Sequence, residues 1–298
     1  MKRNSLFKII LLAFLLFGVP CTVMGRDIAP IVSIDWLEAN LYNPGLIVLD
    51  VRRVEQFREN HIPKAVNVYY GAWAFKKGDL YTEVPELDDL FEMIGYAGIG
   101  YDSHIVVVGK TDTPMESYQV ARVACTLQYA GIVNVALLDG GYNQWVNQKK
   151  PTSSTIVKVE RRPFTGNVKR EMFADKQYIL SRMGKITLLD VREPDYFTGK
   201  KKLDCIPKPG WIPGAVNLPT SCAFTDEGTF KDKQTLTALA EEAVGPDRAK
   251  EIITYCDTGQ CCPTWSYILK EVLGYQKVRI YDGAMQEWMQ NSEAPVAH

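Results

Sequence analysis

The sequence places a reactive residue type at the point where a predicted strand ends. Residues 252–255, Ile-Ile-Thr-Tyr, are β-branched or aromatic, which is typical of a buried strand, and Cys256 follows them directly. A short loop that contains Gly259 leads to an apolar, periodic stretch, which begins near Pro263 and predicts a helix. A thiol is therefore expected between the carboxyl end of a strand and the N-terminus of a helix.

A thiol in that position needs no neighbouring base to become a nucleophile. The N–H groups of the loop and of the first helical turn, together with the helix dipole, favour a thiolate and lower a cysteine's pKa. A Cys–His dyad is not expected, because the histidine of the second half is the last residue, His298. We predict that Cys256 is the catalytic nucleophile and that backbone N–H groups stabilise the anion it carries. These N–H groups belong to Asp257, Thr258, Gly259, Gln260 and Cys261.

Three sequence motifs occur twice along the chain, in the same order. They are a hydrophobic run ending in Asp-Val-Arg, the sequence Ile-Pro-x-Ala-Val-Asn, and an Asp-Gly pair before a tryptophan. They lie at residues 46–52, 61–68 and 135–145 in the first half, and at 186–192, 211–218 and 278–288 in the second. Such ordered repetition indicates a duplicated unit.

Strands that alternate with helices over each half predict the α/β fold class. Each half is expected to form a parallel β-sheet flanked by helices on both faces. We predict an N-terminal domain over residues 26–150 and a C-terminal, catalytic domain over residues 173–298. Residues 151–172, rich in proline, serine and charge, are expected to form an exposed linker.

Asp190 and Arg192 are predicted to lie beside Cys256, because ligands of open parallel sheets bind at the carboxyl ends of the strands. The Arg192 guanidinium could bind an anionic substrate through two parallel hydrogen bonds. It could equally form an ion pair with Asp190 that fixes the loop. Both interpretations remain open at this point, and Asp190 is interpreted as structural support.

The loop and the repeated motifs resemble the rhodanese family of sulfurtransferases, specifically its tandem-domain members. The resemblance rests on the six residues from Cys256 to Cys261, with Gly259 inside, and on the three repeats. It covers almost the whole mature chain, roughly residues 30–295. It implies two rhodanese-like domains of which the first is inactive, and here Gly109 occupies the position that corresponds to the thiol.

The resemblance also implies an activity. Cys256 would attack the outer sulfur of an anionic donor of the thiosulfate or 3-mercaptopyruvate type, become a persulfide, and pass the sulfur to a thiophilic acceptor. Arg192 would help to hold the substrate, and no cofactor is implied. The expected partners are the small-molecule donor and acceptor.

Several residues depart from the pattern of the well-studied thiosulfate enzymes. Asp257 and Thr258 occupy positions where those enzymes carry cations, and Tyr196 occupies the position of a second arginine. Cys261 occupies a position where a hydroxyl residue is common. It could act as a resolving thiol or simply as a small residue at the helix start. The identity of the donor is therefore open.

Two rival functions share the same fold. A cysteine phosphatase or arsenate reductase would need a loop one residue longer that ends in arginine, and that position holds Cys262. A carrier or binding protein for sulfur or other chalcogen species in an exported redox pathway would need no turnover. A metal site is not predicted, because the three nearby cysteines lack a second spaced pair of ligands.

The composition argues against some partners, and the first residues suggest a location. A formal net charge of -1 gives no support to nucleic-acid binding.

Basic residues precede the apolar run of residues 9–19. This is the layout of a secretory signal peptide over residues 1–25, and cleavage is expected after Gly25. We expect export, with the periplasm as the location. The alternative is a lipoprotein anchored at Cys21. No membrane span is expected after the leader.

An exported chain can form disulfides. Cys205 with Cys222 is the pair to test, whereas Cys125 lies in an apolar helical pattern and is interpreted as a core residue.

Overall fold

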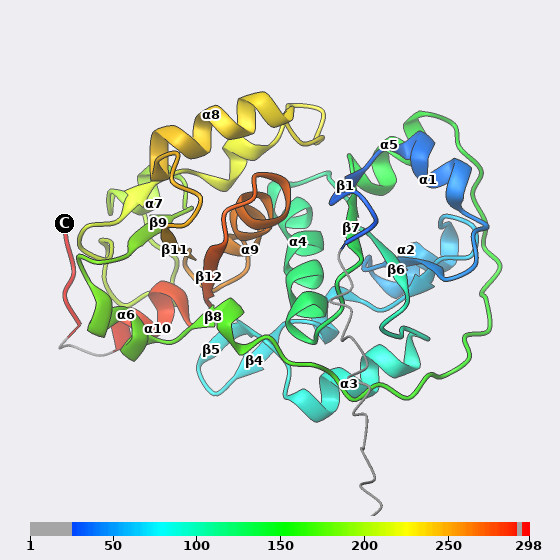
Figure 1. The fold of residues 1–298 in the computed structure, drawn as a ribbon, viewed down its shortest axis with the longest axis horizontal. Helices are drawn as coiled ribbons and strands as arrows, with labels where there is room; N and C mark the ends of the chain where they lie inside the picture. Colours follow the sequence, from blue (N-terminus) through cyan, green and yellow to red (C-terminus); the bar gives the residue numbers. More distant parts are fainter. Residues whose placement is uncertain (1–25, 291–293) are drawn as a thin grey trace, which may run out of the picture.

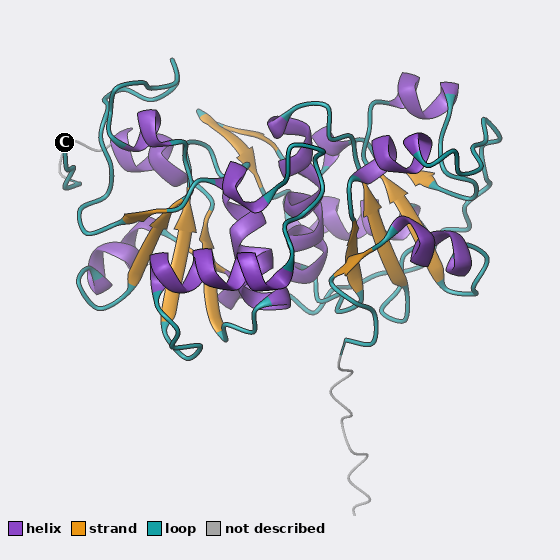
Figure 2. Cartoon of the chain, turned by 90° about the horizontal axis from the view of Figure 1, so that it is seen from above, coloured by secondary structure: helices purple, strands orange, loops and turns teal. Residues whose placement is uncertain are grey.

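Two five-stranded parallel sheets, one from each half of the chain, form the framework of the protein (Figures 1 and 2). The computed structural model describes residues 26–290 and 294–298. The predicted leader and Cys21 lie outside the described residues. The expected α/β class, with helices on both faces of two parallel sheets, is confirmed.

The two sheets have the same strand order, which confirms the duplication. The first runs β1-β7-β6-β2-β3, and the second, read from its β8 edge, runs β8-β12-β11-β9-β10. The strands of the first are β1 (Ile31–Val32), β2 (Leu46–Asp50), β3 (Val66–Asn67), β6 (His104–Val108) and β7 (Val135–Leu138). Those of the second are β8 (Phe173–Ala174), β9 (Thr187–Asp190), β10 (Val216–Asn217), β11 (Glu251–Tyr255) and β12 (Lys277–Tyr281).

Helices cover both sheets. The first domain has α1 (Ile34–Asn40), α2 (Val54–Glu59), η1 (Tyr70–Ala72), α3 (Leu87–Tyr96), α4 (Pro114–Tyr129) and α5 (Gly141–Asn147). The second has η2 (Arg170–Met172), α6 (Lys176–Arg182), α7 (Pro194–Phe197), η3 (Thr220–Ala223), α8 (Lys233–Val244), α9 (Cys262–Tyr267), η4 (Ile268–Val272) and α10 (Ala284–Gln290). None of these described helices is long and apolar enough to cross a bilayer.

The two domains share one hydrophobic core, and α4 and α9 lie side by side between the sheets (Figure 1). A single cluster of buried side chains continues from Leu49 and Val107 in the first sheet to Leu189 and Ile252 in the second. Cys125 of α4 is 2% exposed and belongs to this cluster, as expected for a core residue. The second half is therefore built against the first.

Three local features differ from the sequence-based expectations. The helical pattern of residues 31–41 predicts a helix from Ile31, but Ile31 and Val32 form an edge strand, since they pair with β7. The sequence predicts a helix over residues 118–129, but this helix begins at Pro114, because the Thr113 side chain caps it by accepting the N–H of Glu116. The third feature is an unforeseen antiparallel hairpin, β4 (Phe75–Lys77) and β5 (Leu80–Glu83).

The segment after α5 follows the first domain before the second begins. Ser153 pairs with His61, and the N–H of Arg162 donates to the carbonyl of Gly95.

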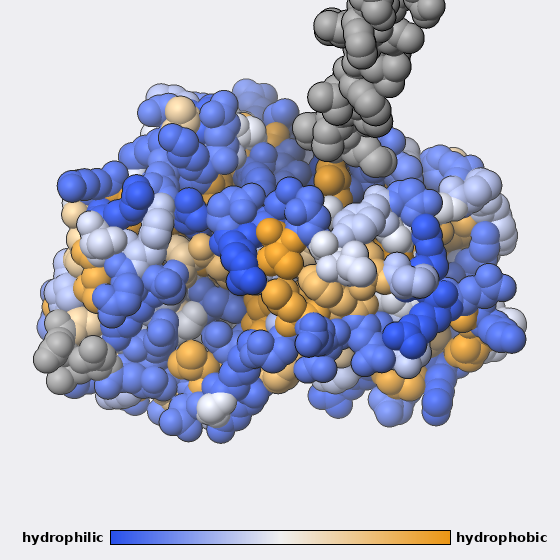
Figure 3. Space-filling view, turned by 60° about the horizontal axis from the view of Figure 1, so that its bottom comes forward, coloured by the Kyte–Doolittle hydropathy of each residue, from blue (hydrophilic) through white to orange (hydrophobic). Residues whose placement is uncertain are grey.

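The face shown in Figure 3 is mostly hydrophilic, with apolar side chains gathered near its middle. Cys205 and Cys222, the pair singled out for a disulfide test, are both free thiols here.

Candidate active site

Cys256 lies at the carboxyl end of the central strand of the second sheet. β11 pairs with β9 on one side and β12 on the other, and its last residue, Tyr255, is in register with Asp190. Cys256 is 2% exposed, yet it lines a cavity of about 500 Å³. The thiol is shielded from bulk water but lies at the wall of a space that a small ligand can occupy.

The loop after Cys256 directs its carbonyl groups outward. The carbonyls of Cys256 and Asp257 accept N–H groups at the start of α10, at 3.0 and 2.9 Å. Those of Thr258 and Gly259 accept hydrogen bonds from side chains of the first domain. Because the N–H of a trans peptide points away from its C=O, the N–H groups of these peptide units face the inside of the loop. Within the described chain, no protein acceptor bonds the N–H groups of residues 257–260.

Gly259 is required by this conformation. Its φ is +87°, in the left-handed region, and a Cβ there would lie 2.5 Å from the carbonyl oxygen of Asp282. The loop therefore bends and packs in a way that any side chain at this position would prevent.

The environment of Cys256 favours the thiolate. Burial alone would raise its pKa, but hydrogen bonds from the thiols and backbone N–H groups of Cys261 and Cys262 outweigh it, so the pKa lies well below its usual value. The pKa of Cys261 is raised, first by its hydrogen bond to Cys256, and that of Cys262 is raised, first by burial. The Cys262 thiol also has the carbonyl of Gly259 as an alternative acceptor at 3.6 Å. Of the three thiols, Cys256 is therefore the one whose surroundings favour the thiolate.

Arg192 is held by protein groups on most sides. Its Nε donates to Asp190 Oδ1 at 2.9 Å, and its Nη2 donates to Asp190 Oδ2 at 2.6 Å and to the carbonyl of Gly210 at 2.9 Å. Its Nη1 lies 3.3 Å from Asp257 Oδ1. The structure thus contains the ion pair with Asp190. One Nη1 hydrogen is left for a ligand, and the substrate-binding role stays a prediction.

Both domains contribute to the cavity. Its wall includes Arg192, Asp257, Thr258, Gln260 and Cys261 of the predicted site. The first domain adds Thr113, Pro114, Met115 and Tyr118, and the second adds Tyr196, Leu203, Thr220 and Ser221. Its charged lining consists of Arg192, Glu193 and Asp257. The cation of the wall is therefore already paired with carboxylates.

A comparison with known families decides the affiliation of this fold and site. The model of the rhodanese-like domain matches residues 33–148 and again residues 174–291. The chain belongs to the rhodanese-like family. Each match contains four strands of one parallel sheet and begins at or just after its short edge strand, β1 or β8, so the protein is a tandem member.

Relatives of similar length support this affiliation. A protein of Mycolicibacterium smegmatis named "Putative thiosulfate sulfurtransferase" is 32% identical, with the alignment covering 89% of this chain and 96% of the relative. A protein of the same name from Synechococcus elongatus is 29% identical, covering 95% of this chain and 90% of the relative.

Solved structures share the fold. The anaerobic ergothioneine biosynthesis enzyme of Chlorobium limicola, in complex with trimethyl histidine, has a TM-score of 0.79 at 20% identity, covering 90% of this chain and 69% of that one. YnjE has a TM-score of 0.79 at 22% identity, covering 90% of this chain and 68% of that one. At these identities the likeness concerns the fold alone.

The sequence did not point to the residues that the first rhodanese-like domain brings to the site. Met115 and Tyr118 come from the start of α4 and line the cavity. Arg122, further along the same helix, donates to the carbonyl of Gly259 at 3.2 Å. A signal was present, because Arg122 is flanked by Val120-Ala121 and Val123-Ala124, and a charge inside an apolar stretch needs a buried partner. Within the described residues, no group of three His, Cys, Asp or Glu side chains is arranged to hold a metal ion.

Asp257 makes the site sensitive to pH. Burial raises the pKa of its carboxyl to about 7; Arg192 opposes this rise, and the neighbouring Cys256 adds to it. The carboxyl is therefore mainly neutral below about pH 7 and ionised above it. An anionic donor that enters the cavity is repelled only by the ionised form.

We expect Asp257→Asn to improve the reaction with an anionic donor in the alkaline range. With thiosulfate, whose charge is constant there, the wild-type kcat/KM should fall as the pH rises through about 7. The Asn variant should give a flat profile and roughly a fivefold higher kcat/KM at about pH 8. Measuring kcat/KM against pH for both proteins checks this. A neutral alkylating reagent serves as the control, since its reaction with Cys256 should change little. A variant profile that still falls near pH 7 would assign the titration to another group.

Proposed function

We propose that the protein is a sulfurtransferase that carries a sulfane sulfur as a Cys256 persulfide. The observation that supports this most is the position of the Cys256 thiol at the cavity wall, where the thiol and N–H donors of Cys261 and Cys262 surround it and lower its pKa. The thiolate attacks the outer sulfur of the donor, an S–S or C–S bond breaks, and the leaving group takes the electron pair. The acceptor then attacks the outer sulfur, and the Cys256 thiolate leaves.

The N–H groups of residues 257–260, which have no acceptor among the described residues, fit a loop that stabilises a persulfide on Cys256. A persulfide extends one sulfur atom further from Cys256 than a thiolate does, so its outer, negatively charged sulfur would be placed inside the loop. Donors that already point to the place where charge develops stabilise it without reorganisation. Their lack of acceptors among the described residues supports a site that binds an anion.

The proposed donor is anionic, of the thiosulfate or 3-mercaptopyruvate type. Arg192 is the cation of the cavity wall, and it already faces Asp190 and Asp257. A monoanionic carboxylate needs less compensation than a dianion in such a site. We therefore propose that 3-mercaptopyruvate is preferred to thiosulfate.

Intact-protein mass spectrometry tests the proposal. The reduced protein should gain the mass of one sulfur atom after incubation with either donor, and cyanide should remove it as thiocyanate. Failure to gain that sulfur, or its location on a residue other than Cys256, would refute the proposal. A protein that takes up one sulfur but does not turn over with cyanide or thiols would instead be the carrier considered above.

We also propose that the protein acts outside the cytoplasm. The support is the basic and apolar pattern of residues 1–25. The periplasm is the proposed location, with attachment at Cys21 as the alternative. N-terminal sequencing of the mature protein distinguishes them, because the free form should begin at Arg26 and the lipoprotein at a modified Cys21.

A further inference from the structure

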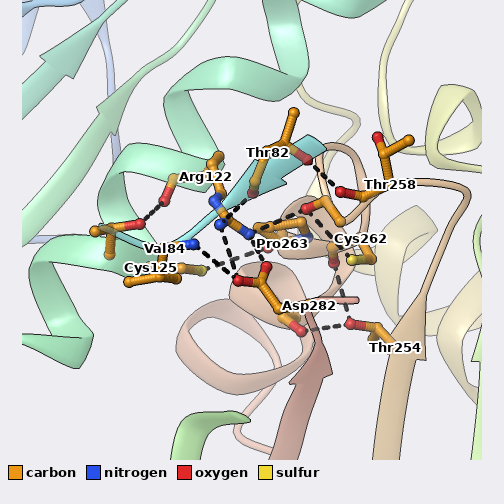
Figure 4. A network of polar contacts seen from close by, with 12 residues as sticks. Thr82, Val84, Arg122, Cys125, Thr254, Thr258, Cys262, Pro263 and Asp282 are labelled. Carbon is orange, nitrogen blue, oxygen red and sulfur yellow. Dashed lines mark hydrogen bonds and ion pairs between the residues drawn. The ribbon is translucent and has the colours of Figure 1, made fainter. Parts of the chain in front are cut away.

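Arg122, a residue of the domain without a catalytic cysteine, lies against the back of the Cys256 loop. It projects from α4, is fully buried, and forms an ion pair with Asp282 of the second domain (Figure 4). Its Nη1 donates to the carbonyl of Gly259 at 3.2 Å, and its Nη2 donates to the carbonyl of Thr82 at 2.6 Å. One guanidinium thus joins α4, the β4–β5 hairpin, the loop and the Asp-Gly motif.

Thr82 contacts the same loop from the hairpin. Its hydroxyl donates to the carbonyl of Thr258, the peptide unit before the one that Arg122 holds (Figure 4). Its φ is +54°, which is uncommon for a β-branched residue and costs about 1–2 kcal/mol. The surrounding contacts therefore hold Thr82 in a conformation that its own backbone disfavours. Such strain persists only where neighbours fix it.

Each domain supplies two of the four contacts that orient the loop. The carbonyls of Cys256 and Asp257 are held by N–H groups of α10, as described above. Those of Thr258 and Gly259 are held by the hydroxyl of Thr82 and the guanidinium of Arg122. Since each peptide unit is planar, fixing a carbonyl also fixes the N–H on its other side. The last two contacts therefore set the direction of the N–H groups of Gly259 and Gln260.

The equivalent loop of the first domain lacks this support. The aspartate of each Asp-Gly motif accepts a backbone N–H of the other domain. Asp282 accepts the N–H of Val84 at 3.0 Å, and Asp139 accepts that of Phe230 at 2.8 Å. Within residues 26–290 and 294–298, however, no side chain of the second domain donates to a carbonyl of residues 109–113. Among the residues that the structure describes, the two side-chain donors from the other domain therefore contact the loop that follows Cys256 and not its counterpart after Gly109.

We propose that Arg122 and Thr82 are positioning residues, through which the domain without a catalytic cysteine aims two N–H groups of the loop at the sulfur on Cys256. This inference rests on the proposed function, because the N–H groups matter only if Cys256 carries an anionic sulfur. It gives the first domain a task in catalysis, although Gly109 leaves that domain without a thiol.

Thr82→Val removes the hydroxyl and keeps the shape and the backbone strain. The pH dependence of Cys256 alkylation by iodoacetamide, measured by peptide mass mapping, gives the apparent pKa of its thiol. We expect that pKa to rise by roughly half a unit to one unit. The rate of sulfur loading should fall about tenfold. The groups that titrate or carry charge near Cys256, the loop or Asp282 are Tyr70, Glu83, Tyr118, Asp257, Cys261, Cys262, Glu287 and Arg192. All of them are retained in this variant.

Tyr267→Phe is the matched control. Tyr267 of α9 donates its hydroxyl to the first domain, where the carbonyls of Pro30 and Val135 lie at 2.8 and 2.7 Å. The variant loses the same kind of interdomain hydrogen bond as Thr82→Val, but far from the loop carbonyls. We expect its alkylation profile and loading rate to match the wild type. An equal loss in both variants would show a general effect of the interface and overturn the proposal.

The paired substitution Arg122→Met with Asp282→Asn tests the guanidinium without leaving a buried carboxylate unpaired. The side-chain amide oxygen that replaces the Asp282 carboxylate can still accept the N–H of Val84. We expect a folded protein whose loading rate falls by about 10²-fold. Unchanged loading and alkylation in both this protein and Thr82→Val would overturn the positioning role while the proposed function stands. A wild type that takes up no sulfur would instead refute the proposed function.

Discussion

Cys256→Ser should lose sulfur transfer by at least about 10³-fold while keeping its fold. A serine hydroxyl is not ionised near neutral pH, and its oxygen cannot form the persulfide that carries the sulfur. The substitution replaces one atom of a residue that is 2% exposed, so the loop and its N–H groups should remain. Thiocyanate formation with each donor, together with intact mass after donor exposure, measures the loss.

Cys261→Ala is the comparison for this experiment. It removes one thiol donor to Cys256 but leaves the backbone N–H groups of Cys261 and Cys262. We expect transfer to fall by about tenfold at most, with sulfur still loaded on Cys256. If sulfur transfer persisted in Cys256→Ser but was lost in Cys261→Ala, the nucleophile would be Cys261 instead.

The sequence predicted the features that are local in the chain. β2 and β9 are short hydrophobic runs that end at the aspartate of Asp-Val-Arg, and the sequence predicts both because strand, charge and repeat coincide. The Cys256 loop was recognised because its determinants, a strand end, Gly259 and a helix start, lie within a dozen residues. Ile31–Val32 was misassigned, since two residues have no detectable periodicity and their strand depends on pairing with β7.

The contribution of the first domain to the site could not be predicted in the same way. Thr82 lies on a hairpin whose Phe75 and Tyr81 are exposed, so no alternating pattern marks it. Arg122 reaches Gly259 because α4 packs on α9, a contact between segments far apart in sequence. Its position in an apolar stretch indicates a buried partner, but the partner, Asp282, is identified only by the fold. The conformation of the Cys256 loop thus depends partly on the interface between the two domains.

Arg192→Met should destabilise the protein by about 3–5 kcal/mol, because Asp190 is fully buried and would lose its cation. The chain contains a matched control in the first domain. Arg52 donates to Asp50 in the same geometry, with Nη2 to Oδ2 at 2.6 Å in both pairs. Arg52→Met should therefore cost a similar amount, plus about 1 kcal/mol for the lost stacking of Arg52 on Tyr142. Urea unfolding of the two variants compares these costs.

The activity of the folded variants separates the two interpretations of Arg192. Since Arg192 has one Nη1 hydrogen left for a ligand, we expect the KM for an anionic donor to rise less than about tenfold in Arg192→Met and to stay unchanged in Arg52→Met. Adding Asp190→Asn to Arg192→Met should restore most of the stability, because no buried carboxylate remains unpaired. A rise in KM of about 10²-fold without loss of stability would show that Arg192 mainly binds substrate. A similar loss of stability in both domains would instead show that the Asp-x-Arg motif maintains a strand end in each of them.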